Sequence, residues 1–384
     1  MQNAVKVSRN IGLDVARSTA IIFVLIAHFS MFFSTKTNIS PILHGFGFFG
    51  VELFFVLSGL LIGRILIRDL LYNHSFQALL SFWKRRWYRT LPAYYLIWSI
   101  LFFRSGSDPN NLVHLFMLQN FFYGPRDLFF GVSWSLAAEE WFYLLAPLLM
   151  YTILKFKITN PRKLMINMCF IGILLAPVLR LIFALLFDQH EHWGDIRKSS
   201  FIRLDAFLFG ILIATIQSYY PYVFTFINKH KYFFLSLSAV GLGLCSTQFR
   251  NMENIATIFN KTILFTLTDF FIALVLILFD SSNLFSKWRN SWKEKVVFFI
   301  SITSYSVYLI HWDIMIKFMS YKVGTASLGL ITVLLLLCTC TTYIVASFIY
   351  MFWERPFLAI RDNNYVIKNI LTFNRTLIDK NSTP

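Results

Sequence analysis

Long apolar runs alternate with short polar segments along the whole chain of 384 residues. A helix needs roughly 20 mostly apolar residues to cross a bilayer, with about 17 as the lower limit, and several runs reach that length only with flanking residues. The runs cover residues 18–33, 46–67, 91–103, 134–154, 164–187, 203–218, 232–247, 262–280, 296–319 and 327–352. This pattern predicts an all-α polytopic membrane protein with about ten transmembrane helices.

A further apolar run over residues 112–123 is shorter, and the loop charges decide how it is interpreted. At about 1.5 Å per residue it covers roughly 18 Å, too little to cross comfortably. If it does not cross and both termini are cytoplasmic, the cytoplasmic segments carry 24 of the 35 Lys and Arg residues. A crossing there would move the basic segment 155–163 outside, against the positive-inside rule. The sequence thus predicts a transmembrane domain over 1–356 and a basic cytoplasmic tail over 357–384.

The composition supports a membrane protein and excludes a nucleic-acid partner. Hydrophobic residues make up 57% of the chain and charged residues 14%, against about 45–50% and 25% in soluble domains. The net charge of +16 then reflects positive-inside loops and contact with anionic headgroups of the lipid bilayer. Ser58-Gly59 predicts close helix packing. The cysteines lack CxxC spacing and predict small buried packing residues, with no disulfide and no metal site: Cys169, Cys245, Cys338 and Cys340.

Ionisable residues inside the expected spans gather at one depth. Such residues are energetically costly in a bilayer and usually mark function. In the ten-span topology they lie in the outer half of seven spans: His28, Glu52, Glu139, Glu140, Arg180, Arg203, Asp205, Asp269, His311 and Asp313. We therefore expect one polar cavity inside the bundle that opens away from the cytoplasm.

Arg17 and His28 share one helix face, because eleven steps of about 100° make three turns plus roughly 20°. The rise between them is roughly 16 Å, so Arg17 lies near the cytoplasm when His28 faces the cavity. Asp14 precedes Arg17 by three residues on the same stripe and is placed to hold its guanidinium group.

A second basic cluster, Arg85, Arg86 and Arg89, lies before Pro92, which suits the first turn of the third span. Arg85 and Arg86 are four and three residues from Arg89 and therefore share a helix face with it. The cluster predicts a cytoplasmic arginine fork suited to phosphate. The alternative is a positive-inside anchor of the kind that every membrane protein needs.

Six segments together resemble the acyltransferase-3 family of bacterial integral-membrane O-acyltransferases. They occur in the family's order over nearly the whole chain, although Glu52 stands where the family often has Asp. The segments are Gly12-Leu-Asp-Val-Ala-Arg-Ser18 running to His28, Gly50-Val-Glu-Leu-Phe-Phe-Val-Leu-Ser-Gly59, Arg85-Arg-Trp-Tyr-Arg-Thr-Leu-Pro92, Trp134-Ser-Leu-Ala-Ala-Glu-Glu-Trp-Phe-Tyr143, Tyr308-Leu-Ile-His311 and Trp353-Glu-Arg-Pro356.

The resemblance implies transfer of an acyl group, commonly acetyl, from acyl-CoA to a sugar hydroxyl of an envelope glycan or glycolipid such as O-antigen or an exopolysaccharide. It implies the bacterial cytoplasmic (inner) membrane as the location, and acyl-CoA as a donor substrate rather than a permanently bound cofactor. Carried over by motif, His28 is the essential histidine and Glu139 the glutamate of the Trp-Ser-Leu motif. Arg17, Arg86 and Arg89 are the motif arginines.

The resulting hypothesis gives His28 the role of general base or of transient acyl carrier, and the sequence leaves direct and two-step transfer open. Glu52 or Glu139 is expected to set the tautomer of His28, with packing or gating as the alternative for Glu52. A donor from Trp134-Ser135 is expected to stabilise the oxyanion.

Two further residues are assigned to substrate binding with open alternatives. Arg203 either contacts the acceptor or pairs structurally with Asp205. His311 belongs either to packing or to the site.

The main rival interpretation is a transporter or flippase for an envelope lipid or glycan, which would also place ionisable residues in a central cavity. A transporter has no need for an arginine fork aligned with a buried histidine. The sequence also shows no pair of broken half-helices related by an inverted repeat.

Overall fold

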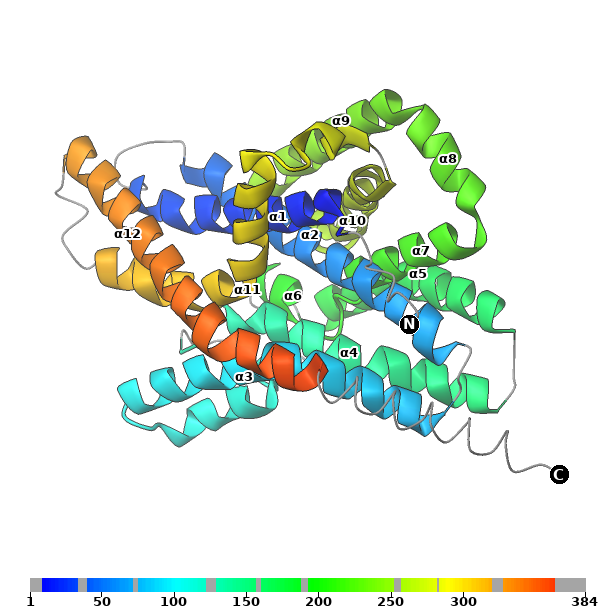
Figure 1. Ribbon diagram of the computed structural model, residues 1–384, viewed down its shortest axis with the longest axis horizontal. Coiled ribbons are helices and arrows are strands. Elements are labelled where there is room, and N and C mark those ends of the chain that lie inside the picture. The colour runs from blue at the N-terminus through cyan, green and yellow to red at the C-terminus, as the bar shows by residue number, and fades with distance from the viewer. Residues whose placement is uncertain are drawn as a thin grey trace.

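The computed structural model describes residues 9–33, 40–71, 75–121, 129–156, 160–187, 193–251, 257–281, 283–319 and 327–362. Within these ranges the chain is helical and contains no strand, which confirms the all-α prediction (Figure 1). The elements are α1 (Ile11–Phe29), η1 (Ser30–Phe33), α2 (Ser40–Ile65), η2 (Leu66–Leu70), α3 (Phe76–Arg104), η3 (Pro109–Phe116), α4 (Ser133–Lys155), α5 (Pro161–Phe187), α6 (Trp193–Lys198), α7 (Asp205–Tyr219), α8 (Pro221–Lys229), α9 (Lys231–Asn251), α10 (Ile258–Ser281), η4 (Asn283–Trp288), α11 (Trp292–Met319), α12 (Leu328–Ile349) and η6 (Tyr350–Glu354).

Seven helices in the described ranges are long and apolar enough to cross a membrane, and α7 with α8, bent by 102°, would make an eighth. The predicted runs 91–103 and 134–154 lie within α3 and α4, which are helical but outside this set. The count of ten and the orientation of the termini therefore stay predictions. Residues 112–116 of the short run over 112–123 belong to the 3₁₀ helix η3, residues 117–121 are not helical, and the last two residues lie outside the described residues.

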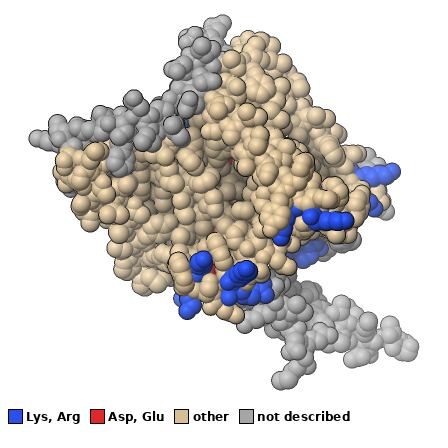
Figure 2. Space-filling model, turned by 90° about the horizontal axis from the view of Figure 1, so that it is seen from above, with Lys and Arg blue, Asp and Glu red and all other residues tan. Residues whose placement is uncertain are grey.

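Helix α2 is the centre of the bundle and the most buried of the candidate spans. Its most extensive contacts are with α7 and α1; α1 also packs on α11, and α11 on α12. Helix α12 runs obliquely along one edge and is the least buried span (Figure 1). The face in Figure 2 is mainly tan, with the Lys and Arg side chains gathered toward one side, as expected for a molecule with a lipid-facing surface and one basic end.

Helices α2 and α7 cross in backbone contact because small residues face each other there. A Cβ atom on Gly59 would lie 2.0 Å from the carbonyl oxygen of Phe207, and one on Gly210 would lie 2.1 Å from that of Val56. Transmembrane helices that approach this closely use small residues at the crossing. The close packing predicted at Ser58-Gly59 is confirmed.

Two expectations need correction. Pro92 is not in a first turn: α3 begins at Phe76, where the Ser75 side chain accepts the backbone N–H of Ala78, so Pro92 lies inside a 29-residue helix. The boundary at 356 stays a prediction, since helical structure continues to Asp362 and residues 363–384 of the expected tail lie outside the described residues. Cys340 is exposed, unlike the other three cysteines.

We predict that Gly59→Ala lowers the stability of the folded protein by about 1–3 kcal/mol, because the added methyl group must push α2 and α7 apart. Gly243→Ala in α9 is the matched control, since a Cβ atom there meets nothing within 4 Å and Ala is the better helix former. The measurement is the thermal unfolding midpoint of each variant in detergent, with the remaining folded protein quantified by size-exclusion chromatography. Equal midpoints for the two variants would contradict the packing assigned to the crossing.

Candidate active site

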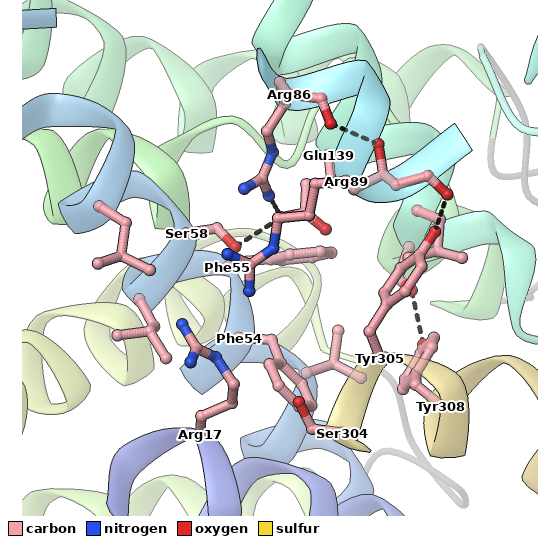
Figure 3. A pocket seen from close by; sticks show the side chains of 16 residues that line it. Arg17, Phe54, Phe55, Ser58, Arg86, Arg89, Glu139, Ser304, Tyr305 and Tyr308 are labelled. Atoms are coloured by element: carbon pink, nitrogen blue, oxygen red, sulfur yellow. Dashed lines mark hydrogen bonds and ion pairs between the residues drawn. The ribbon is translucent and has the colours of Figure 1, made fainter. Parts of the chain in front are cut away.

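A narrow cavity of about 80 Å³ lies between α1, α2, α3, α4 and α11. Figure 3 shows Arg17 entering it from α1 and Arg86 and Arg89 from α3 on the opposite side. The structure thus brings together three of the arginines that the sequence assigned to the donor. We call this space the arginine cavity. Its other polar lining residues are Ser58, Thr90, Ser135, Glu139, Ser304, Tyr305 and Tyr308.

Glu139 lies in the wall of this cavity and binds Arg86 of α3. Its Oε1 accepts hydrogen bonds from Arg86 Nη2 at 2.6 Å and Ser58 Oγ at 2.6 Å, and from the Tyr143 hydroxyl group. The guanidinium group of Arg86 also lies 3.9 Å from the centre of the Tyr143 ring. Glu139 therefore orients Arg86, and its contacts do not support the expectation that it orients His28.

Arg17 is held from two sides at the opposite wall. Its Nη1 donates to Ser301 Oγ at 3.1 Å and lies 3.8 Å from Asp14, as the three-residue spacing indicated. Ser301 in turn donates to Asp14 at 2.7 Å. This network joins α1 to α11 and holds the guanidinium group at the cavity wall.

Arg85 does not belong to the arginine cavity. It pairs with Asp69 of η2, and its side chain is not among those that line the cavity. The predicted fork of three arginines is therefore wrong in this detail. Arg86 and Arg89 face inward, whereas Arg85 connects α3 to the end of the second span.

His28 and His311 form a pair in which His311 is fully buried and His28 is partly buried. Nδ1 of His28 lies 2.7 Å from Nε2 of His311, and the two rings are stacked with their centres 4.9 Å apart. Trp312 packs edge-on against His28 at 5.0 Å. His311 thus contacts His28 directly, in the position that the sequence assigned to Glu52 or Glu139.

The hydrogen bonds of His311 determine the tautomer of its partner. His311 Nδ1 lies 2.9 Å from the carbonyl oxygen of Tyr308 and 3.2 Å from that of Val307. A carbonyl oxygen only accepts, so Nδ1 of His311 carries a proton and, in the neutral ring, Nε2 is the acceptor. Nδ1 of His28 must then donate to it. This leaves Nε2 of His28 unprotonated, which is the form a base or nucleophile requires.

A pair of hydroxyl groups connects the histidines to the arginine cavity. Ser135 Oγ and the Tyr308 hydroxyl lie 2.6 Å apart, and both residues line the cavity. Tyr308 is one helical turn before His311 and its backbone binds that ring. Trp134, just before Ser135, is buried with its ring edge toward Phe55. The cavity therefore ends next to the histidine pair.

Glu52 and Arg203 form a fully buried ion pair, and Arg180 pairs with Asp205 at 2.8 Å beside them. All four side chains are at most 1% exposed. Glu52 is thus committed to Arg203 and does not orient His28. Arg203 pairs with Glu52 and not with Asp205 as expected, and it is too enclosed to contact an acceptor.

Some cavity residues had no role in the prediction from sequence. Tyr305 donates to the carbonyl oxygen of Thr90 at 2.8 Å, and Thr90 donates to Glu140 at 2.6 Å. The signal for Tyr305 was the hydroxyl-rich stretch over 301–306, which is unusual in an apolar helix. Among the described residues no group of three or more His, Cys, Asp and Glu is placed to hold a metal ion.

Comparison with known proteins identifies relatives along nearly the whole chain. Residues 10–351 match the family model described as an acyltransferase domain. The chain is 31% identical over 374 residues to the O-acetyltransferase OatA of Staphylococcus aureus strain NCTC 8325, covering 90% of this chain and 56% of that protein. It is 34% identical over 184 residues to the peptidoglycan O-acetyltransferase OatA of Listeria monocytogenes, covering 43% of this chain and 28% of that protein. The chain thus spans little more than half the length of the staphylococcal relative. No solved structure matches.

We predict that Glu52→Gln destabilises the fold by about 3–5 kcal/mol, because it leaves the Arg203 charge buried without its counterion. Asp362→Asn is the control, since Asp362 pairs with Arg361 but is 63% exposed and such pairs contribute at most about 1 kcal/mol. Thermal unfolding in detergent measures both. A Glu52→Gln midpoint equal to that of Asp362→Asn would show that the buried pair is not a stabilising contact.

Proposed function

Because this chain belongs to the acyltransferase-3 family, we propose that it is a membrane O-acetyltransferase that moves an acetyl group from acetyl-CoA to a hydroxyl group of a cell-envelope glycan. The observation that carries the proposal is the shared boundary between the arginine cavity and the histidine pair. Tyr308 lines the cavity and binds His311, which binds His28. An anion-binding cavity that ends at a base is what transfer from a phosphate-bearing thioester requires.

The arginine cavity receives the donor in this proposal. Arg17, Arg86 and Arg89 are suited to the phosphates of coenzyme A, because guanidinium groups bind phosphate through charge-assisted, often bidentate hydrogen bonds. The cavity is narrow, about 80 Å³, so the phosphates stay at its mouth beside the exposed Arg89. Only the slender pantetheine arm and the thioester reach the end formed by Ser135 and Tyr308.

His28 then activates the acceptor. Its Nε2 removes the proton of the sugar hydroxyl while the hydroxyl oxygen attacks the thioester carbonyl carbon, so that a carbon–oxygen bond forms and the carbonyl electrons move onto oxygen. The tetrahedral intermediate collapses when the carbon–sulfur bond breaks. The leaving thiolate takes the proton that His28 now carries on Nε2, which gives free coenzyme A as the thiol and restores the neutral base.

The same geometry also suits a two-step route in which Nε2 of His28 attacks the thioester and carries the acetyl group briefly as an acetyl-imidazole. His311 serves both routes, because its bond to Nδ1 keeps Nε2 of His28 free and turned in one direction. Rapid acid quench without acceptor distinguishes them, since only the two-step route accumulates acetyl-histidine.

The acceptor is an envelope glycan at the bacterial cytoplasmic membrane. The Listeria relative is named for peptidoglycan, so peptidoglycan is the first acceptor to test, followed by O-antigen and exopolysaccharide. Transfer of labelled acetyl groups from acetyl-CoA to these glycans by purified protein also separates the enzyme from a transporter.

We predict that His28→Ala lowers kcat by about 10²–10⁴-fold, the usual contribution of a general base. His311→Ala should lower kcat less, because His28 keeps its ring but loses the bond that fixes its tautomer. The measurement is acetyl transfer by protein in nanodiscs. His230→Ala is the control, since His230 lies between α8 and α9 and contacts only the Phe226 ring among the described aromatic contacts.

Near-normal transfer by His28→Ala, with accumulation and unfolding midpoint unchanged, would defeat the assignment of His28. A loss of transfer in His230→Ala as large as in His28→Ala would show that the assay reports general damage to the protein.

We predict that Arg89→Gln raises the KM for acetyl-CoA at least about tenfold, because one charge-assisted phosphate contact contributes about 1.5–3 kcal/mol. Arg85→Gln is the matched control on the same helix, since Arg85 pairs with Asp69 outside the cavity. Initial rates over a range of acetyl-CoA concentrations give both constants. An unchanged KM in Arg89→Gln would leave the arginines of α3 as a topology signal only.

A further inference from the structure

Arg197, at the end of the short helix α6, lies among three aromatic rings beside the histidine pair. Its guanidinium carbon is 5.6 Å from the centre of the Phe48 ring, 5.7 Å from Trp134 and 5.8 Å from Phe249. A cation within about 6 Å of an aromatic ring is attracted to its face. These rings come from α2, α4 and α9, so they hold the charge inside the bundle and not on its surface.

The backbone around Arg197 is tied directly to the start of α4. The buried Asn120 side chain donates to the carbonyl oxygens of Trp134 at 2.8 Å and Lys198 at 2.6 Å, and the Ser200 N–H donates to the Asn120 carbonyl at 2.8 Å. The segment that carries Arg197 is thereby fixed relative to Trp134. Ser135, the residue after Trp134, lines the arginine cavity, so Arg197 is fixed relative to the wall that α4 contributes to that cavity.

The charge of Arg197 acts on the groups where transfer would occur. Among the described arginines it has the largest electrostatic effect on His28, and it also acts on Tyr308. Burial lowers the pKa of Arg197 to about 10, with Glu52 opposing the shift, so the guanidinium group remains charged at neutral pH. Positive charge is therefore present near both His28 and Tyr308.

Arg203 does not supply this charge, although the sequence assigned it to the substrate. It is paired with Glu52 and its guanidinium carbon lies 4.1 Å from the centre of the Phe265 ring. Arg197 differs because it is only half-buried, whereas Arg203 is 1% exposed. A ligand can therefore approach Arg197 more easily than it can approach Arg203.

We propose that Arg197 stabilises the oxyanion that forms on the thioester carbonyl when the acetyl group is transferred at His28. This inference rests on the proposed function. As the new carbon–oxygen bond forms, the electron pair of the carbonyl double bond moves onto oxygen and makes it negative. When the carbon–sulfur bond breaks, that pair re-forms the double bond and the negative charge leaves with the thiolate. A fixed cation in a site lined by aromatic rings interacts strongly with such a charge, because little water screens it.

The test compares two acceptors in one preparation of protein in nanodiscs with acetyl-CoA. One is an envelope glycan that the wild-type protein acetylates, and the other is water, measured as slow release of CoA without glycan. Both reactions pass through the same kind of oxyanion. Arg197→Gln should therefore lower both rates by a similar factor, about 10²–10³, with the KM for acetyl-CoA changed less than about twofold.

Two further variants sharpen the comparison. Arg197→Lys keeps the charge and should recover part of both rates. Lys198→Gln is the matched control, since it removes a neighbouring charge on the same helix, and both rates should stay within about twofold of wild type. If Arg197→Gln does not accumulate, Arg197→Met replaces it, because a long apolar side chain suits the aromatic surroundings, and the same loss of both rates is expected.

Three outcomes would overturn the proposal. The first is unchanged rates in Arg197→Gln. The second is loss of glycan acetylation alone, which would make Arg197 an acceptor-binding residue. The third is a loss of both rates in Lys198→Gln as large as in Arg197→Gln, which would show that the rates depend on the total positive charge of this segment and not on Arg197 itself. If the wild-type protein itself transfers no acetyl group to glycan or water, the proposed function fails and this inference fails with it.

Discussion

Ionisable side chains inside an apolar helix bundle need partners, and this structure is arranged around that constraint. An unpaired charge at such a position costs several kcal/mol. Arg180 with Asp205 and Arg203 with Glu52 meet the requirement in fully buried ion pairs. Each pair joins two helices or a helix and its neighbouring segment, so the charges help to decide which elements surround α2. The close crossing of α2 and α7 then brings Glu52 and Arg203 within reach of each other.

A second group of polar residues is not balanced in this way. The arginine cavity is lined by three arginines but only one carboxylate, Glu139. Glu139 is shared among Arg86, Ser58 and Tyr143, and Asp14, behind the wall, is shared between Arg17 and Arg9. These carboxylates therefore neutralise only part of the positive charge. A cavity of this kind favours an anionic ligand. The hydroxyl groups of Ser135 and Tyr308 also line this cavity, and the backbone of Tyr308 contacts His311, so the arginines and the histidine pair lie in adjoining parts of the bundle.

The differences between prediction and structure have one physical cause. Helical periodicity identifies which residues share a face, and it correctly related Arg17 to Asp14 and placed His28 inside the bundle. Helical periodicity contains no information about which helix face packs against which face of another helix. Glu52 and His28 lie at similar predicted depths, yet Glu52 faces Arg203 and His28 faces His311. Arg85 and Arg86 are adjacent in sequence, but about 100° of rotation between them sends one to Asp69 and the other to Glu139.

The sequence by itself determined the membrane environment, the helical class, the family and the charged residues of the cavity, because these depend on composition, on local periodicity and on motifs read in order. Only the tertiary structure decided the partners. The tautomer of His28 follows from a ring 283 residues away, and the place of Arg197 follows from Asn120, which binds Trp134 and Lys198 together. Such contacts join distant segments, and their geometry arises only when the helices pack.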